Sequence, residues 1–191
     1  MLLDAPAAGR LVDQAAMALS SAPDTLFEVL GGLPAPTYAI DCEGTITYFN
    51  HACIELAGRT PVCGRDKWCV TWKVYTTDGE FVPHDQCPMA VAIREKRAIR
   101  NVEAVARRPD GSTVYLVPFP TPYYDADGNL AGAINLLLDI SRHRGPDYLH
   151  AQADKCRRLA RSIANCTAAE KLDLMATNYD TQATKLTRAA R

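Results

Sequence analysis

The sequence predicts an α+β protein with a five-stranded antiparallel sheet, helices over one face of the sheet and helical extensions at both ends. Three observations support this prediction. Residues 37–49 and 99–140 are rich in β-forming side chains and are divided by acidic–glycine turns. Residues 9–31 and 147–189 instead repeat apolar side chains at helical spacing. Short turns between successive strands favour antiparallel neighbours, because parallel strands need a long crossover.

The N-terminal residues 1–32 are predicted to form a helical extension before the sheet. Leu11, Ala15 and Leu19 share one helical face at spacings of four residues. Such an apolar stripe gains nothing unless another surface buries it. We therefore expect a homodimer through the terminal helices.

The first half of the sheet is predicted as a hairpin over 37–49 that turns at Asp41 to Gly44. Asn50 is a good N-cap for a short helix that follows. A second, small hairpin is expected over 72–82, and a longer helix begins with Pro88 at its first position.

Three strands complete the sheet, at residues 99–108, 112–119 and 129–140, with a proline-rich bend after the second of them. The last strand has apolar residues at both its odd and its even positions, so both of its faces are expected to be buried.

The C-terminal residues 143–191 are predicted to form an antiparallel helical hairpin. Pro146 introduces the first helix, and a capping box from Thr167 to Glu170 introduces the second. Each helix has one apolar stripe, and the link between them is only a few residues long, so the two stripes are expected to pack together.

Composition limits the classes of function. The 191 residues are 48% hydrophobic and 23% charged, which suits one packed domain with appendages. A net charge of −1 supplies no positive field, so no nucleic-acid partner is expected. The N-terminus lacks the basic region of a secretory signal, and no window approaches the ~20 apolar residues of a membrane span. We expect a cytoplasmic protein with no membrane partner, whose seven cysteines are mostly reduced.

Four segments, in order, resemble the PAS sensory domain family over about residues 25–142. Residues 33–56 resemble its opening strands and first helix, and the turn 108–112 resembles the one between its third-last and second-last strands. Residues 125–138 resemble its final turn and strand, and Asp139-Ile140-Ser141 resembles the Asp-x-Thr exit motif, with Ser in place of Thr. The resemblance implies a PAS domain at 33–142, of a kind found in bacterial sensory proteins.

The same resemblance implies a pocket for a small molecule or cofactor between the sheet and the helices. Asn135 is the sharpest candidate, because it shares strand parity with Ala131, Ala133 and Leu137 and so projects from an apolar face. The other pocket candidates are Trp68, Trp72, His84, Met89 and Tyr115. For each aromatic residue, a plain role in the core is the alternative.

Four soft or borderline ligands suggest a metal or redox site as a rival function. Cys63-x5-Cys69 followed by His84-x2-Cys87 is enough for tetrahedral zinc, although the first spacing is wide. His84 is also a candidate axial ligand for haem. Cys87 would cap the helix that begins at Pro88, where the helix dipole favours an oxidation-prone thiolate, unless it is a buried, inert thiol.

The sequence does not predict an enzyme. It contains no Gly-rich phosphate loop, nucleophile elbow or paired-carboxylate motif, and the surroundings of His150 do not match a phosphoacceptor box. The Asn-Cys-Arg-Phe-Leu-Gln stretch of flavin photosensors is missing too, so flavin adduct chemistry is not supported. We expect a sensory module that passes a signal from the core through Asp139-Ile140-Ser141 to the hairpin, and from there to a protein partner in trans. A ligand-free interaction scaffold is a further alternative.

Overall fold

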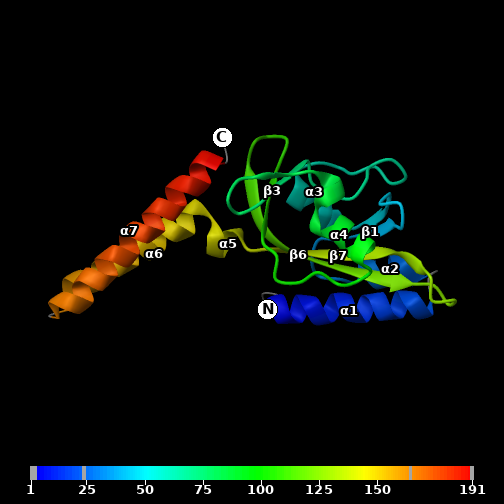
Figure 1. Cartoon of the computed structure of the whole chain (residues 1–191), viewed down its shortest axis with the longest axis horizontal. Coiled ribbons are helices and arrows are strands. Elements are labelled where there is room, and N and C mark those ends of the chain that lie inside the picture. Colours follow the sequence, from blue (N-terminus) through cyan, green and yellow to red (C-terminus); the bar gives the residue numbers. More distant parts are fainter. Residues whose placement is uncertain (1–3, 23–24, 164, 190–191) are drawn as a thin grey trace. The chain divides into compact units, whose positions relative to one another are not determined.

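The computed structural model describes residues 4–22, 25–163 and 165–189. The chain divides into two compact units, residues 1–139 and 140–191 (Figure 1). None of the helices in the described ranges has both the length and the apolar character needed to cross a bilayer.

The first unit is built on one antiparallel sheet with the strand order β2-β1-β7-β6-β5-β3-β4. The strands are β1 (Thr37–Asp41), β2 (Ile46–Phe49), β3 (Lys73–Tyr75), β4 (Phe81–Val82), β5 (Ala104–Arg107), β6 (Thr113–Tyr124) and β7 (Leu130–Asp139). The predicted α+β class and antiparallel sheet are confirmed. The sheet has seven strands, not five, because the small hairpin predicted over 72–82 joins its edge as β3 and β4.

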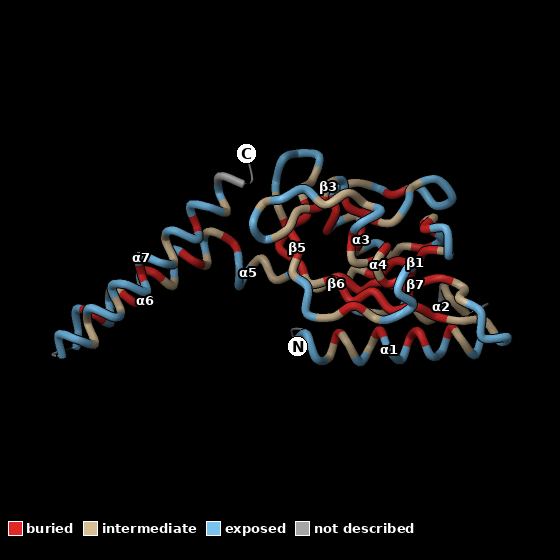
Figure 2. Tube along the Cα trace, in the orientation of Figure 1, coloured by how far each residue is buried: buried red, intermediate tan, exposed pale blue. Residues whose placement is uncertain are grey.

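Both faces of the sheet are covered, and Figure 2 shows the buried residues between the layers. One face carries α3 (His51–Ala57), the 59–71 segment, the 3-10 turn η2 (His84–Gln86) and α4 (Pro88–Glu95). The other face carries α1 (Ala5–Ser21) and α2 (Leu26–Gly31). Strand β7 lies inside the sheet, between β1 and β6, and buries residues on both of its faces, as predicted.

The N-terminal helix α1 packs on its own sheet, against β6 and β7. Its buried face consists of Ala8, Val12, Ala15, Ala16 and Leu19. The apolar stripe predicted in this helix is therefore buried within the chain. That removes the reason for which this helix was expected to form a dimer interface.

An arginine from the segment after α4 ties α1 to the sheet. Arg100 forms an ion pair with Asp13 of α1, and donates to the Thr121 hydroxyl of β6 at 2.7 Å and to the Pro120 carbonyl at 3.1 Å. Its guanidinium also lies 5.7 Å from the centre of the Phe119 ring. Because these contacts come from two elements, Arg100 fixes the helix against the strand.

The three prolines of β6 continue the strand, so the predicted bend is wrong. Pro118, Pro120 and Pro122 alternate along it. Pairing with β5 ends at Leu116, and the Pro120 carbonyl accepts from the Ile99 N–H at 3.1 Å on that side. Proline has no N–H group to donate to a neighbouring strand. At these three positions the N–H would point to the edge of β6 that β5 no longer covers, and a sheet tolerates proline at such an edge. The predicted strand 99–108 is correspondingly short and begins only at Ala104.

A bulge near the start of β7 changes which of its residues face the same side of the sheet, so the predicted grouping of Ala131 with Ala133 is wrong. Tyr123 pairs with Gly132 but Tyr124 pairs with Leu130, so one extra residue, Ala131, lies between them. Ala131 consequently packs on the α1 face, while Ala133 packs on the α4 face. Only glycine fits at the bulge, because a Cβ at Gly132 would lie 2.2 Å from the Ile40 carbonyl oxygen.

The second unit begins with the short helix α5 (Ser141–Arg144) and continues as the predicted hairpin of α6 (Pro146–Ser162) and α7 (Cys166–Ala189). The buried cluster of the hairpin consists of the small side chains Ala153, Cys156 and Ala176, with the half-buried Leu172 and Tyr179 packed against them. Helix α7 begins at Cys166, one residue before the predicted capping box at Thr167. Asn165 takes the capping role, since its side chain accepts from the Ala168 N–H at 3.1 Å.

Candidate functional site

A cavity of about 20 Å³ lies between the sheet and α4, where the resemblance implied a pocket. Its lining includes Tyr38, Cys69, Thr71, Cys87, Met89 and Asn135. A space of this size holds one water molecule, whereas sites for small-molecule ligands usually measure about 300–1,000 Å³. In this conformation the chain's own side chains fill the pocket, and neither haem nor a flavin fits there.

Asn135 projects into this layer from β7, as predicted, and is 2% exposed. Its side-chain oxygen accepts from the Phe119 N–H at 2.8 Å, and its amide nitrogen donates to the Tyr38 hydroxyl at 3.1 Å. The Tyr38 hydroxyl donates in turn to the Trp68 carbonyl at 3.1 Å. A relay of hydrogen bonds therefore joins the neighbouring strands β6, β7 and β1 to the 59–71 segment.

Tyr38 is a member of this relay that sequence reasoning missed. Burial raises the pKa of Tyr38 well above its ordinary value, and the nearby Cys69 and Cys87 add to this effect. The phenol therefore stays neutral and keeps its proton to donate. Its position in a short buried strand was visible in the sequence, but its partners, far along the chain, were not.

Trp68 is held by its backbone at the edge of the cavity layer. Its φ of 67° lies in the left-handed region, and its N–H donates to the Gly44 carbonyl at 2.7 Å. The indole ring covers Gly44 so closely that a Cβ there would lie 2.5 Å from ring atoms. Trp68 does not line the cavity, but the next residue, Cys69, does, and so does Tyr38, which donates to the Trp68 carbonyl.

An ion pair braces the 59–71 segment that presents Cys69. Arg59 pairs with Asp66 and also donates to the carbonyls of Val70 and Thr71, at 3.4 and 3.5 Å. Partial burial alone would raise the pKa of Asp66, but the Val62 N–H and the Arg59 guanidinium outweigh it and lower that pKa. The carboxylate therefore stays charged and keeps the segment folded back on itself.

Two of the predicted metal ligands, Cys69 and Cys87, meet at the cavity. Cys69 follows Trp68 and is 7% exposed; Cys87 is the N-cap residue of α4 and is 2% exposed. The Cys69 sulfur lies 3.0 Å from the Thr71 hydroxyl oxygen. Both thiols are free. They come from the two segments that close over the sheet, so the tertiary fold alone brings them together.

The four predicted metal ligands do not assemble into one site. Cys63 is exposed at the surface of the 59–71 segment, and His84 is half-buried in η2. Over residues 4–22, 25–163 and 165–189, no three His, Cys, Asp or Glu side chains are grouped so as to hold a metal ion. His84 nevertheless lies near enough to Cys69 for its charge to favour the thiolate.

The remaining pocket candidates are divided between the two faces of the sheet and the surface. Met89 is fully buried and lines the cavity. Trp72 is 43% exposed and stacks with Lys73, whose ammonium lies 4.5 Å from the ring centre. Tyr115 follows Val114 and precedes Leu116, which both face the cavity side, so alternation turns Tyr115 to the opposite face. Neither aromatic residue walls the cavity.

A surface groove of about 340 Å³ lies beside the cavity layer, along β3, β4, the start of α4 and the 97–104 segment. None of the predicted site residues lines it. Its walls are mostly aliphatic, with the charged residues Arg97 and Glu103 among them.

The predicted exit motif occupies the junction between the two units. Strand β7 ends at Asp139, Ile140 precedes α5, and Ser141 is the first residue of that helix. The His143 N–H donates to the Ile140 carbonyl, and the Gly145 N–H donates to the Ser141 carbonyl, both at 2.8 Å. The last strand of the sheet therefore runs directly into a helical turn.

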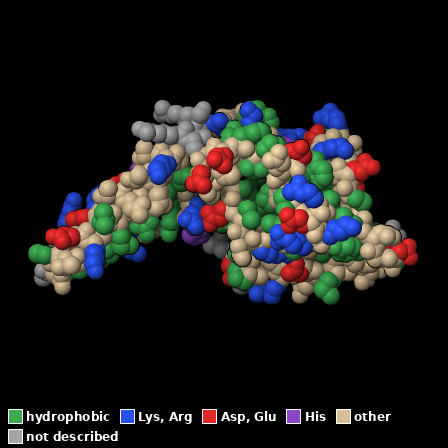
Figure 3. All heavy atoms as spheres, in the orientation of Figure 1, with side chains coloured by type: hydrophobic (Ala, Val, Ile, Leu, Met, Phe, Trp, Pro, Cys, Tyr) green, Lys and Arg blue, Asp and Glu red, His purple; other side chains and the backbone are tan. Residues whose placement is uncertain are grey.

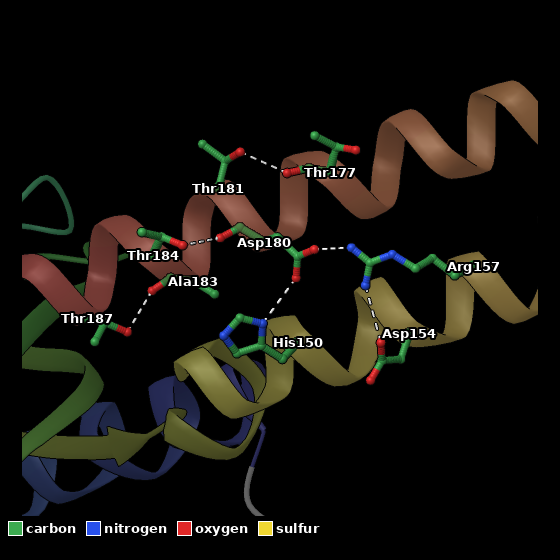
Figure 4. A network of polar contacts seen from close by, with 9 residues as sticks. All are labelled: His150, Asp154, Arg157, Thr177, Asp180, Thr181, Ala183, Thr184 and Thr187. Atoms are coloured by element: carbon green, nitrogen blue, oxygen red, sulfur yellow. Dashed lines mark hydrogen bonds and ion pairs between the residues drawn. The ribbon is translucent and has the colours of Figure 1, made fainter.

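Polar contacts fasten the two helices of the hairpin to each other (Figure 4). Asp180 of α7 pairs with Arg157 of α6, and its other oxygen lies 3.1 Å from Nδ1 of His150. The hydrogen bond from Arg157 is the main reason that the pKa of Asp180 lies below its ordinary value, and His150 adds to it. His150 lies at the surface, with 54% of its side chain exposed, and also contacts the second helix.

Comparison with known proteins places the first unit in a family. A family model described as PAS domain matches residues 36–142. A search of the curated proteins finds no relative.

Several solved structures resemble the chain at low sequence identity. The LOV protein of Rhodobacter sphaeroides is 13% identical, with 86% of this chain and 96% of that chain covered and a TM-score of 0.46. The PAS domain of Bordetella pertussis BvgS is 21% identical, with 62% and 84% covered and a TM-score of 0.42. A PAS domain from Colwellia psychrerythraea is 16% identical, with 63% and 98% covered and a TM-score of 0.47. With the family match spanning the whole sheet, from β1 to the exit motif, the chain belongs to the PAS domain family.

Proposed function

We propose that this PAS domain is a sensory and relay module that acts by binding and conformational change, without catalysis, in the cytoplasm. A single observation carries the proposal. Strand β7 holds Asn135 and Leu137 against the cavity, is buried on its other face beneath α1, and ends at the exit motif. A change in the cavity therefore reaches the helical exit within four residues along one strand.

The hairpin supplies the output surface in this proposal. Leu159 and Ile163 of the α6 end, and Leu174 and Met175 of α7, are exposed, with Leu174 at 71%. Figure 3 shows hydrophobic side chains on the surface of this unit among charged ones. Only two alanines and a cysteine are fully packed in its core, with Leu172 and Tyr179 half-buried beside them, so a binding partner would stabilise it. The partner is a signalling protein in trans, and a second copy of the chain can use the same apolar residues.

Deletion of residues 143–191 tests the hairpin as output. The truncated chain should remain folded, because the two units are compact separately, but it should lose partner binding and signalling in cells. Light scattering of the full chain at high micromolar concentration should give a dimer, and Leu174→Ser should weaken it. Asn178→Ser, at an exposed polar position of the same helix, is the matched control. Full partner binding by the truncated chain would contradict the proposal.

A ligand-free interaction scaffold is the second candidate, and the size of the cavity favours it. About 20 Å³ leaves a ligand no room unless α4 or the 59–71 segment moves. Native mass spectrometry of protein purified from its own host distinguishes the two candidates. A bound small molecule supports a ligand sensor, and an unliganded chain that still binds its partner supports the scaffold.

A further inference from the structure

We infer that Cys69 and Cys87 are an oxidisable pair, which a small peroxide converts into an intramolecular disulfide. The two thiols belong to different segments, and both border the same cavity, which has room for only one water molecule. Thr71 holds the Cys69 sulfur, with its hydroxyl oxygen at 3.0 Å. The inference concerns the chemistry of this pair and stands apart from the proposed output through the hairpin.

The surroundings assign a different role to each thiol. The hydrogen bond from Cys87 is the main cause that lowers the pKa of Cys69, and His84 and Thr71 lower it further against the opposing effect of burial. The pKa of Cys87 is raised well above its ordinary value, first by its hydrogen bond to Cys69 and then by burial. The pair therefore gives up one proton readily and holds the second. Cys69 is the attacking thiolate and Cys87 is the resolving thiol.

The cavity selects the oxidant by size. A space with room for one water molecule favours the smallest oxidants, and hydrogen peroxide, with one more oxygen atom than water, is the smallest peroxide. A bulky disulfide such as oxidised glutathione is excluded, because the two residues are only 7% and 2% exposed.

The reaction balances with hydrogen peroxide as the oxidant. The Cys69 thiolate attacks one peroxide oxygen; the S–O bond forms, the O–O bond breaks, and the leaving hydroxide takes up a proton to become water. Cys69 is then a sulfenic acid. The Cys87 sulfur attacks the Cys69 sulfur, the S–S bond forms, and the S–O bond breaks with loss of a second water that carries the Cys87 proton. Two thiols are oxidised by two electrons, and one peroxide is reduced to two waters.

The other cysteines supply the controls. Cys53 is buried like the pair, but burial raises its pKa to about 12 and its sulfur contacts the Thr37 carbonyl, so it should not react. The exposed thiols Cys42, Cys63 and Cys166 can be replaced by Ser together, to prevent disulfides between molecules.

The experiment treats this triple-Ser full-length protein, after reduction, with equimolar hydrogen peroxide. Peptide mass spectrometry without reductant should find one cross-link, between the peptides that contain Cys69 and Cys87, and Cys53 should remain free. Cys69 should react faster than Cys53 in the same protein, because burial keeps the Cys53 thiol protonated. Oxidised glutathione should give no cross-link.

Two further variants test the roles, with circular dichroism to confirm that each is folded. Cys87→Ser should leave Cys69 as a sulfenic acid, which dimedone traps when the oxidised protein is unfolded in its presence, whereas Cys69→Ser should leave Cys87 unreactive. A folded protein that forms no Cys69–Cys87 cross-link would overturn the inference, as would oxidation of Cys53 at the same rate. Trapping on Cys87 instead of Cys69 would overturn the assigned roles. None of these readouts depends on signalling, so the proposed function can fail while this inference holds.

Discussion

The relay from Asn135 through Tyr38 to Trp68 allows a quantitative test of what holds the cavity layer together. The perturbations are Tyr38→Phe and Asn135→Leu, separately and combined. Asn135→Leu removes two hydrogen bonds, those to the Phe119 N–H and to the Tyr38 hydroxyl. Tyr38→Phe also removes two, the shared bond and the one to the Trp68 carbonyl. The double variant removes three bonds in total, because one bond is common to both.

The expected magnitudes follow from this bookkeeping. A net contribution of about 0.5–1.5 kcal/mol for each bond gives a loss of about 1–3 kcal/mol in each single variant. The double variant should lose less than the sum of the singles, by about 0.5–1.5 kcal/mol, which is the shared bond counted twice. Phe and Leu are apolar and suit these buried positions, so the fold should persist.

The assay is urea unfolding of the four proteins, followed by far-UV circular dichroism and analysed for the free energy of unfolding. Tyr124→Phe is the matched control, since its hydroxyl donates to the Lys96 carbonyl at an exposed position and should matter little. Strict additivity of the two single variants would refute the relay. A neutral Asn135→Leu would show that the amide serves a ligand and not the core.

Three further predictions address other parts of the structure. Gly44→Ala should destabilise the protein by more than about 2 kcal/mol in urea unfolding, because its Cβ would lie 2.5 Å from atoms of the Trp68 ring. Gly128 has a similar positive φ but open space around it, so Gly128→Ala should lower the free energy of unfolding by only about 1 kcal/mol. Equal losses in the two variants would contradict the packing argument. Gly9→Ala should raise the free energy of unfolding by about 0.5–1 kcal/mol, because the residue is inside α1 and the new Cβ would make ordinary contacts no closer than 3.8 Å. A lower free energy of unfolding would show that the helix needs glycine there. Asp180→Asn should speed amide exchange in α6 and α7 at neutral pH. Because the pKa of Asp180 is lowered in the folded chain, its carboxylate stabilises the hairpin above the ordinary pKa, and this contribution is lost as pH falls through the folded pKa. The difference in exchange between variant and wild type should therefore vanish in acid, and a difference that does not change with pH would contradict the role of the charge.

Several expectations failed where the outcome depended on partners that lie far along the chain. The stripe of α1 predicted a buried face, but the sequence did not say that β6 and β7 of the same chain would cover it. The prolines after residue 117 predicted a bend, since a central strand excludes them. They remain in β6 because β5 ends at its pairing with Leu116 and leaves that edge of β6 without a strand.

The sequence by itself determined the order and type of the elements. Alternating and helical periodicities, acidic–glycine turns and caps such as Asn50 are local signals, because each depends on residues a few positions apart. They were sufficient for the antiparallel sheet, the burial of β7 on both faces and the C-terminal hairpin. They also grouped Asn135 with Ala133 and Leu137, but it was the resemblance to the PAS family that pointed this face of the strand at the pocket.

The tertiary structure alone decided what the site contains. It brought Cys69 and Cys87 to the same cavity and left Cys63 at the surface, although spacing in the sequence treated all three as ligands of one metal. It also fixed the cavity at about 20 Å³, a quantity that depends on how side chains from the sheet, α4 and the 59–71 segment fill the space between them. Distances across layers and the volume left between them arise only when separate elements pack, so local patterns in the sequence do not encode them.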